Sequence, residues 1–237
     1  MYKRQVFTAG DNAYETGSLA NYADCYDPTW GAFADRTWPV PGNHEYGTPG
    51  AAGYFDYFGA RAGTVGAGWY AYDLGGWRIY ALNSNCAVVG CAAGSAQEQW
   101  LRADLAASPR ACVLAYWHHP RFSSGEHGND PEVAPLWDAL YEAGAEVIVN
   151  GHDHDYERFA PQTPTGEANS ATGIREFVVG TGGAALRAFS TVRANSQVRN
   201  SATYGVVKLT LSPTGYAWQF VAAGSGTFRD SGSSTCH

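Results

Sequence analysis

The chain has 237 residues, of which 45% are apolar and 16% charged, which indicates one sizeable globular domain, or at most two small ones, and excludes a disordered chain. The net charge of −7 gives no nucleic-acid-binding signature, because such proteins usually carry a basic face, but bound cations could still reverse the local field for an anionic substrate. No apolar run reaches the length of a transmembrane segment.

Patterns of apolar residues predict strands that alternate with helices. Gly75 and Gly76 separate two alternating runs, which is typical of a hairpin. Ser95, with Glu98 three residues later, forms a capping box at the start of the clearest helix. Strands are expected at residues 6–9, 69–74, 77–82, 112–117, 147–149, 174–179, 204–211 and 216–221, and helices at 95–107 and 131–143. This order indicates an α/β sheet with antiparallel strands added by the late hairpin.

The two ends of the chain differ from residues 6–229, which we expect to form one domain without an internal linker. Residues 1–5 resemble the translated end of a sequencing adapter, and we interpret them as a non-native start. The alternative is a genuine short basic N-terminus. Residues 230–237 are expected to form a loose tail unless Cys236 anchors them.

The five cysteines include no CxxC spacing, so a structural zinc site is not expected. Cys86 and Cys91 flank a short loop and could close a local disulfide. An odd count fits a chain that has lost a cysteine partner upstream. Together with few Lys and Arg and many Asn, Ser, Thr and Gly, this favours a secreted or periplasmic protein, whose signal peptide would have been lost with the N-terminus.

Six of the seven histidines fall into four short segments, at residues 42–45, 117–120, 126–128 and 151–154. Several segments directly follow predicted strands, and Asp11 ends the first strand in the same way. Polar residues at the carboxyl ends of strands mark the usual active-site edge of an α/β sheet. Imidazole and carboxylate ligands suit zinc, iron and manganese.

Each of these residues also has a structural interpretation. A single Asp after a strand is more often a turn former, and a single His is more often a hydrogen-bonded structural residue. His152 and His154, at alternate positions, could simply line one side of an extended segment. The same geometry lets two imidazoles converge on neighbouring metals, and the five segments taken together favour a metal site.

The segments resemble the calcineurin-like metallophosphoesterase superfamily, in the family's order. They read Gly-Asp-Asn-Ala-Tyr at 10–14, Gly-Asn-His-Glu at 42–45, His-His-Pro at 118–120 and Gly-His-Asp-His at 151–154. Tyr14 and the Asp-Tyr-Glu-Arg run at 155–158 are similar to the purple acid phosphatase-like branch, and more closely to its secreted bacterial alkaline-phosphatase-like members. The resemblance implies a four-layer α/β/β/α sandwich of two mixed sheets flanked by helices.

The resemblance implies a role for each matching residue. Asp11 would bridge two metal ions, which could be Fe, Zn or Mn. The second metal's other ligands would be Asn43, His118 and His152, and the first metal's would be Tyr14 and His154. His44 would contact the substrate phosphate and protonate the leaving oxygen, a role that His127 could share. His119 fits neither role and is interpreted as structural or as a support for the ligands.

The implied activity is hydrolysis of phosphate esters by in-line attack of a metal-bound hydroxide, with phosphomonoesters expected first, as in acid and alkaline phosphatases. The substrate would be a phosphorylated small molecule or macromolecule, with the irregular segments 47–68 and 161–173 shaping its pocket. Alternatives within the family are a phosphodiesterase or a nucleotide hydrolase. Others are an inactive metal-binding fragment and, given the many Trp and Tyr residues, a carbohydrate-binding protein.

One part of the family pattern has no counterpart in this sequence. The family has an earlier strand whose Asp completes the ligands of the first metal, and only residues 1–5 precede Val6 here. We therefore expect the domain to lack its first strand, a helix and that ligand.

Overall fold

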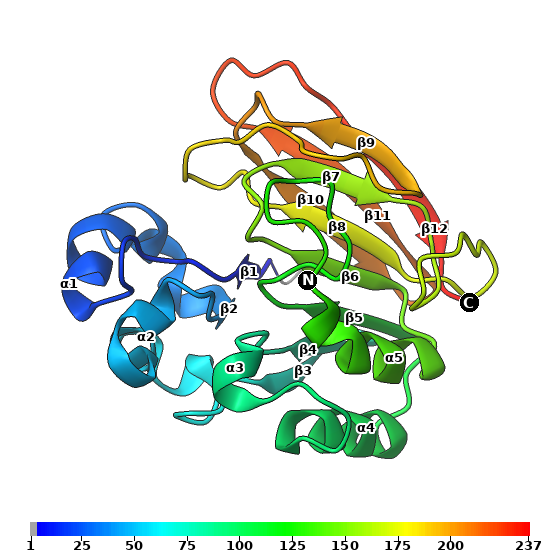
Figure 1. Cartoon of the computed structure of the whole chain (residues 1–237), viewed down its shortest axis with the longest axis horizontal. Helices are drawn as coiled ribbons and strands as arrows, with labels where there is room; N and C mark the ends of the chain where they lie inside the picture. The colour runs from blue at the N-terminus through cyan, green and yellow to red at the C-terminus, as the bar shows by residue number, and fades with distance from the viewer. Residues whose placement is uncertain (1–3) are drawn as a thin grey trace.

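The computed structural model describes residues 4–237 (Figure 1). Its largest sheet has seven strands, in the order β3-β4-β5-β6-β8-β7-β9. These are β3 (Tyr70–Leu74), β4 (Trp77–Ala81), β5 (Cys112–Tyr116), β6 (Val147–Asn150), β7 (Tyr156–Phe159), β8 (Arg175–Val179) and β9 (Ser196–Asn200). The central strands β4, β5, β6 and β8 pair in parallel, whereas β3, β7 and β9 pair antiparallel with their neighbours.

The two faces of this sheet pack against different layers. Successive residues of a strand point to opposite faces. On β5, Val113 and Ala115 pack in the cluster that includes helices α4 (Ala96–Ala107) and α5 (Ala134–Glu142). Leu114 and Tyr116 pack in the cluster that includes the smaller sheets. Both faces are buried, which explains why the central strands are almost continuously apolar.

Two smaller sheets cover the face away from α4 and α5. β1 (Val6–Ala9) pairs in parallel with β2 (Thr37–Val40). β10 (Gly205–Ser212), β11 (Gly215–Ala222) and β12 (Ser231–Thr235) form an antiparallel sheet, layered against the large sheet in Figure 1. This arrangement confirms the mixed α/β fold of several sheets flanked by helices, with the second sheet divided into two parts.

An N-terminal helical lobe packs beside β2 (Figure 1). It contains α1 (Leu19–Asn21), a π-helix (Tyr22–Tyr26), a 3₁₀ helix (Trp30–Arg36) and α2 (Ala52–Phe58), around an aromatic cluster that includes Tyr22, Tyr54 and Phe58. The segment 47–68, expected to be irregular, is therefore partly helical. α3 (Cys86–Val89) was not expected either. Among residues 4–237, none of the helices has the length and apolar character needed to cross a membrane.

The C-terminal residues 230–237 are held in the fold, because Cys236 anchors them, which was the stated exception to a loose tail. Strand β12 pairs with β11, and a disulfide joins Cys236 to Cys112 at the start of β5. The polar β12 sequence carries no apolar residue that could signal a strand. The expected Cys86–Cys91 disulfide is confirmed, and Cys25 is an exposed free thiol. The expectation for residues 1–5 lies largely outside the described residues.

Candidate metal centre

Four strands carry the predicted site residues to one edge of the sheets. Asp11 follows β1, Asn43 follows β2, His118 follows β5, and His152 follows β6. β1 pairs in parallel with β2, and β5 with β6. The carboxyl ends of parallel strands meet at the same edge, which brings these four loops together.

The side chains of these loops converge on the Nε2 atom of His118. This atom lies 3.0 Å from Asn43 Oδ1, 3.2 Å from Asp11 Oδ2 and 3.1 Å from His152 Nδ1. His118 is buried and the Asp11 side chain is only 6% exposed. One carboxylate, one amide oxygen and two imidazole nitrogens thus face a single point.

A second group of side chains adjoins the first through Asp11. The Tyr14 hydroxyl lies 3.3 Å from Asp11 Oδ2 and 3.3 Å from His154 Nε2. Asp11 Oδ2 is therefore shared between the two groups, as a bridging carboxylate requires.

The hydrogen bonds of the histidines fix which ring nitrogen is free. His118 Nδ1 lies 2.8 Å from the Ala9 carbonyl oxygen, and His154 Nδ1 lies 2.9 Å from the Ala185 carbonyl oxygen. A carbonyl oxygen only accepts, so both Nδ1 atoms carry the proton. The Nε2 atoms of both rings consequently present a lone pair to the centre, the arrangement typical of metal-binding histidines.

Two glycines allow this close approach. A Cβ atom at Gly10 would lie 2.5 Å from His118 Nδ1, and one at Gly42 would lie 2.1 Å from Asp11 Oδ1. Asp11 and His152 themselves have positive φ values of 50° and 66°. Such left-handed conformations are uncommon for residues other than glycine and often occur at functional sites.

Glu45 holds the two N-terminal loops in register. Its buried carboxylate accepts five hydrogen bonds, at 2.7–3.2 Å, from the backbone N–H groups of Asp11, Asn12, Ala13 and Gly42 and the Tyr22 hydroxyl. These donors come from both loops that supply Asp11 and Asn43. Sequence analysis assigned Glu45 only to the Gly-Asn-His-Glu motif and missed this function.

The charge states of the cluster suit metal binding. Burial, with the nearby imidazoles of His118, His119 and His127, lowers the pKa of His152 to about 2. Burial opposes ionisation of both Asp11 and His118, but their mutual attraction holds the pKa of Asp11 well below its usual range and raises the pKa of His118, so a metal would take the place of the proton on His118. A neutral imidazole and an ionised carboxylate are the forms that bind metals.

The two predicted catalytic histidines lie on either side of this cluster. His44 is 30% exposed, its backbone N–H donates to Asp11 Oδ1 at 3.0 Å, and its Nε2 lies 4.0 Å from Asp11 Oδ2. The His127 ring stacks on His152, with centroids 4.1 Å apart and an interplanar angle of 29°. Both rings are therefore next to the candidate metal ligands.

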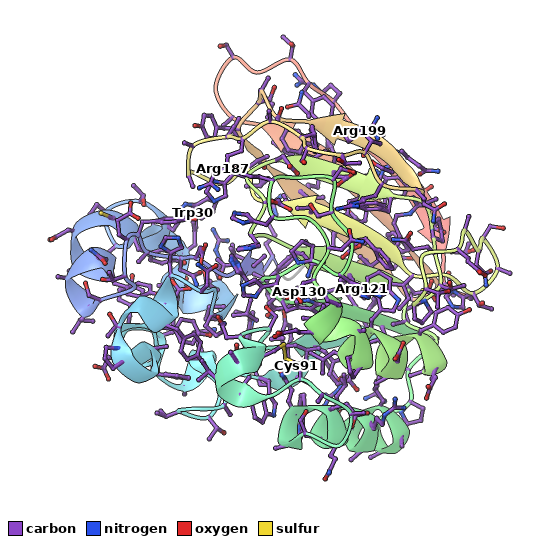
Figure 2. All side chains as sticks on the ribbon, in the orientation of Figure 1. Trp30, Cys91, Arg121, Asp130, Arg187 and Arg199 are labelled. Carbon is purple, nitrogen blue, oxygen red and sulfur yellow. A yellow bond between two sulfur atoms is a disulfide. The ribbon has the colours of Figure 1, made fainter. Side chains whose placement is uncertain are left out.

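Two further residues belong to the surroundings of the site. His119 Nδ1 lies 2.8 Å from Ser84 Oγ, and the potential ligand atoms of His118, His119 and His152 all lie within 4.8 Å of one another. His119 is thus closer to the centre than its structural interpretation suggested. Arg187 donates a hydrogen bond to His127 Nε2 at 3.1 Å. It lies on the loop after β8 (Figure 2), outside every motif considered from the sequence.

The donor set fits a pair of metal ions. Asp11, Asn43, His118 and His152 would hold one ion, and Asp11, Tyr14 and His154 the other. The free Nε2 lone pairs, the ionised carboxylate and the amide oxygen match the preferences of zinc, iron and manganese. The second group has three protein donors, one fewer than the first.

The chain belongs to the calcineurin-like phosphoesterase family, whose sequence profile matches residues 3–156. It is 29% identical over 190 residues to purple acid phosphatase 15 of Arabidopsis thaliana, covering 65% of this chain and 35% of that protein. It is 28% identical over 169 residues to the uncharacterized protein Rv2577 of Mycobacterium tuberculosis, covering 60% of this chain and 32% of that protein. The chain thus spans about a third of the length of these relatives.

Solved structures share the fold at lower identity. The purple acid phosphatase PPD1 from yellow lupin (Lupinus luteus) seeds matches with a TM-score of 0.78 and 19% identity, over 96% of this chain and 46% of that chain. GAP50 of Plasmodium matches with a TM-score of 0.66 and 15% identity, over 95% of this chain and 77% of that chain. These matches agree with the fold described above.

Proposed function

We propose that this domain hydrolyses phosphate esters with two metal ions, and that phosphomonoesters are its main substrates. The observation that carries the proposal is the convergence of Asp11, Asn43 and His152 within 3.2 Å of His118 Nε2. Family membership supports the same chemistry. When bound, the metals would supply Lewis acidity and lower the pKa of the attacking water.

The protein's own residues would hold and orient the reactants. Asp11 would contribute to both metal positions, since its Oδ2 lies 3.2 Å from His118 Nε2 and 3.3 Å from the Tyr14 hydroxyl. His44 Nδ1 is protonated, because it lies 2.5 Å from the Glu15 carbonyl oxygen. In the imidazolium form of the ring, Nε2 would contact the phosphate and donate its proton to the leaving oxygen. We assign it the role of general acid.

His127 would play a different part. Arg187 donates to its Nε2, so this nitrogen is an acceptor and the proton sits on Nδ1. The neutral ring can donate one hydrogen bond to a substrate oxygen from Nδ1. Protonation at Nε2 would break the contact with Arg187, so we assign His127 a binding role and not proton transfer.

The first metal position has three donors among residues 4–237, namely Asp11, Tyr14 and His154. The edges of β1 and β10 that face away from β2 and β11 have no strand partner among residues 4–237. Both edges line a cavity of about 1560 Å³ that also reaches Asp11 and His154. We propose that a further strand fills this groove and brings a carboxylate to Tyr14 and His154, as the resemblance implies.

Two disulfides support a location outside the cytoplasm, where thiols are not kept reduced. We propose that the protein is secreted or periplasmic. Localisation of the natural gene product by cell fractionation tests this, and recovery of the bulk of the protein in the cytoplasm would contradict it.

The activity is tested with an aryl phosphate and the metal-loaded natural protein. We expect Asp11→Asn and His152→Ala to lower kcat/KM by about a thousandfold or more, since each removes a ligand at the centre. Asp56→Asn, an exposed carboxylate on α2, is the matched control. Metal content is measured in parallel by mass spectrometry. Full activity in either site variant would refute the proposed site.

A further inference from the structure

The loop that follows β8 is fastened to the candidate metal centre at several points. The Ala185 carbonyl accepts from His154 Nδ1 at 2.9 Å, and the Arg187 N–H donates to the His154 carbonyl at 3.0 Å. Further along, the Ser190 N–H donates to the Ser124 carbonyl at 2.8 Å. Arg187 is consequently fixed at its backbone beside a candidate metal ligand.

The Arg187 guanidinium uses only part of its donor capacity. Its Nη1 donates to His127 Nε2 at 3.1 Å and to Glu126 Oε2 at 3.2 Å. Nε and Nη2 make no hydrogen bond to residues 4–237, and the side chain is 40% exposed. The Glu126 side chain is 60% exposed, so this ion pair is worth little, and the other guanidinium N–H groups stay free to donate to a ligand.

The contacts of the guanidinium place this donor beside the centre. His127 lies against His152, with ring centroids 4.1 Å apart, and Arg187 contacts the edge of the His127 ring at Nε2. The guanidinium makes no hydrogen bond to any candidate metal ligand among residues 4–237. Its free donors are therefore available to a substrate group that extends beyond the reacting phosphate.

We propose that Arg187 selects phosphate esters that carry a second anionic group, a second phosphate or a carboxylate, by donating paired hydrogen bonds to that group. This proposal rests on the phosphoesterase activity proposed above and names its substrate class. The planar guanidinium matches phosphate and carboxylate oxygens in geometry, and it stays charged at any working pH.

A matched pair of substrates tests the proposal. Propane-1,3-diyl bisphosphate and propyl phosphate differ only in the second phosphate. We expect the natural protein to favour the bisphosphate in kcat/KM, and Arg187→Gln to lower that preference by about tenfold. Arg187→Lys keeps the charge but loses the planar pair of N–H donors, so it should retain part of the preference for the bisphosphate. Arg229→Gln, which removes an exposed arginine bonded only to nearby carbonyls, should retain all of it.

Binding of non-reacting analogues separates this proposal from the proposed activity. Calorimetry compares 1,3-propylenediphosphonate with propylphosphonate on the metal-loaded protein, and Arg187→Gln should selectively weaken the diphosphonate. Absence of hydrolysis of any phosphate ester would refute the activity, while the binding ratio would still decide the role of Arg187. An unchanged ratio in Arg187→Gln would overturn the proposal. An equal loss with both substrates would also overturn it and would show that Arg187 only positions His127.

Discussion

At the scale of single residues, the site is held together by groups that do not themselves face the centre. Glu45 joins the two loops that supply Asp11 and Asn43, and glycines at 10 and 42 let those loops touch. The motifs predicted which side chains meet at this centre. They could not reveal that one buried carboxylate gathers four N–H groups, because that depends on two loops 30 residues apart meeting in space.

Replacement of Glu45 by Gln tests this function. Gln has nearly the same shape but replaces one acceptor oxygen with a donor, which leaves at least two N–H groups facing an N–H₂ group. We expect a loss of about 2–4 kcal/mol in the free energy of unfolding, because buried donors lose their partner. Metal affinity should fall as well.

Chemical denaturation of the metal-free protein measures the loss. Glu167→Gln, at an exposed position on the loop between β7 and β8, is the control. A Glu45→Gln variant with the stability of the control would show that the hydrogen-bond cluster contributes nothing.

At the scale of elements, apolar patterns predicted eight of the described strands but missed β2 and β7, although both contain buried apolar residues. Strands 6–9, 112–116 and 147–150 and helix 96–107 appear within about one residue of their predicted bounds, with Ser95 capping that helix. β9 and β12 are polar and were missed. They are strands because they pair with β7 and β11 and not because of their own residues.

The disulfide Cys112–Cys236 should account for much of the stability of β12. It closes a loop of 124 residues, which restricts the unfolded chain, while β12 itself contributes no apolar side chain to the core. We expect the Cys112→Ala/Cys236→Ala double variant to lose about 2–4 kcal/mol of unfolding free energy. Denaturation under non-reducing conditions measures this, with Cys25→Ser as a control that should match the natural protein. Equal stability of all three would mean that strand pairing alone holds the C-terminus.

The buried Glu176 on β8 should make the free energy of unfolding depend on pH. Its buried carboxylate accepts from the N–H groups of Arg121 and Phe122, but Oε2 has no partner among the described residues. Burial, reinforced by Glu157, raises the pKa of Glu176 well above its ordinary value. The folded state therefore holds this proton to higher pH than the unfolded state.

Because the folded state binds the extra proton, Glu176 should lower stability as the pH rises above about 4.3, its unfolded pKa. The loss grows by about 1.4 kcal/mol for each pKa unit of the shift and levels off above the folded pKa. Glu176→Gln cannot ionise, so its stability relative to the natural protein should increase from pH 4 to pH 8. Denaturation across this range measures the difference. A constant difference would contradict a raised pKa.

At the scale of the whole molecule, the candidate metal centre joins two sheets that also pack against each other through apolar side chains. Asp11 and Asn43 belong to the β1–β2 pair, whereas His118 and His152 belong to the large sheet. The sequence predicted that these side chains meet, through the resemblance. It could not predict that the second sheet would be divided, with the open edges of β1 and β10 lining one groove, since strand pairing there is non-local.

Metal binding should add to the contacts that hold the two sheets together, and the two metal positions should differ in affinity. Residues 4–237 offer four donors at one position and three at the other, so we expect a zinc titration to show one tight and one weaker site. Filling the tight site at about a hundredfold excess over its Kd should add about 2.7 kcal/mol to the free energy of unfolding.

Asn43→Ala should remove most of this gain, because Asn43 contacts only the four-donor group. Tyr14→Phe should weaken only the second binding event. Calorimetric titration and thermal denaturation with and without chelator measure both effects, with Asp56→Asn as the control. If both substitutions weakened the tight site equally, the division into two positions around Asp11 would be wrong.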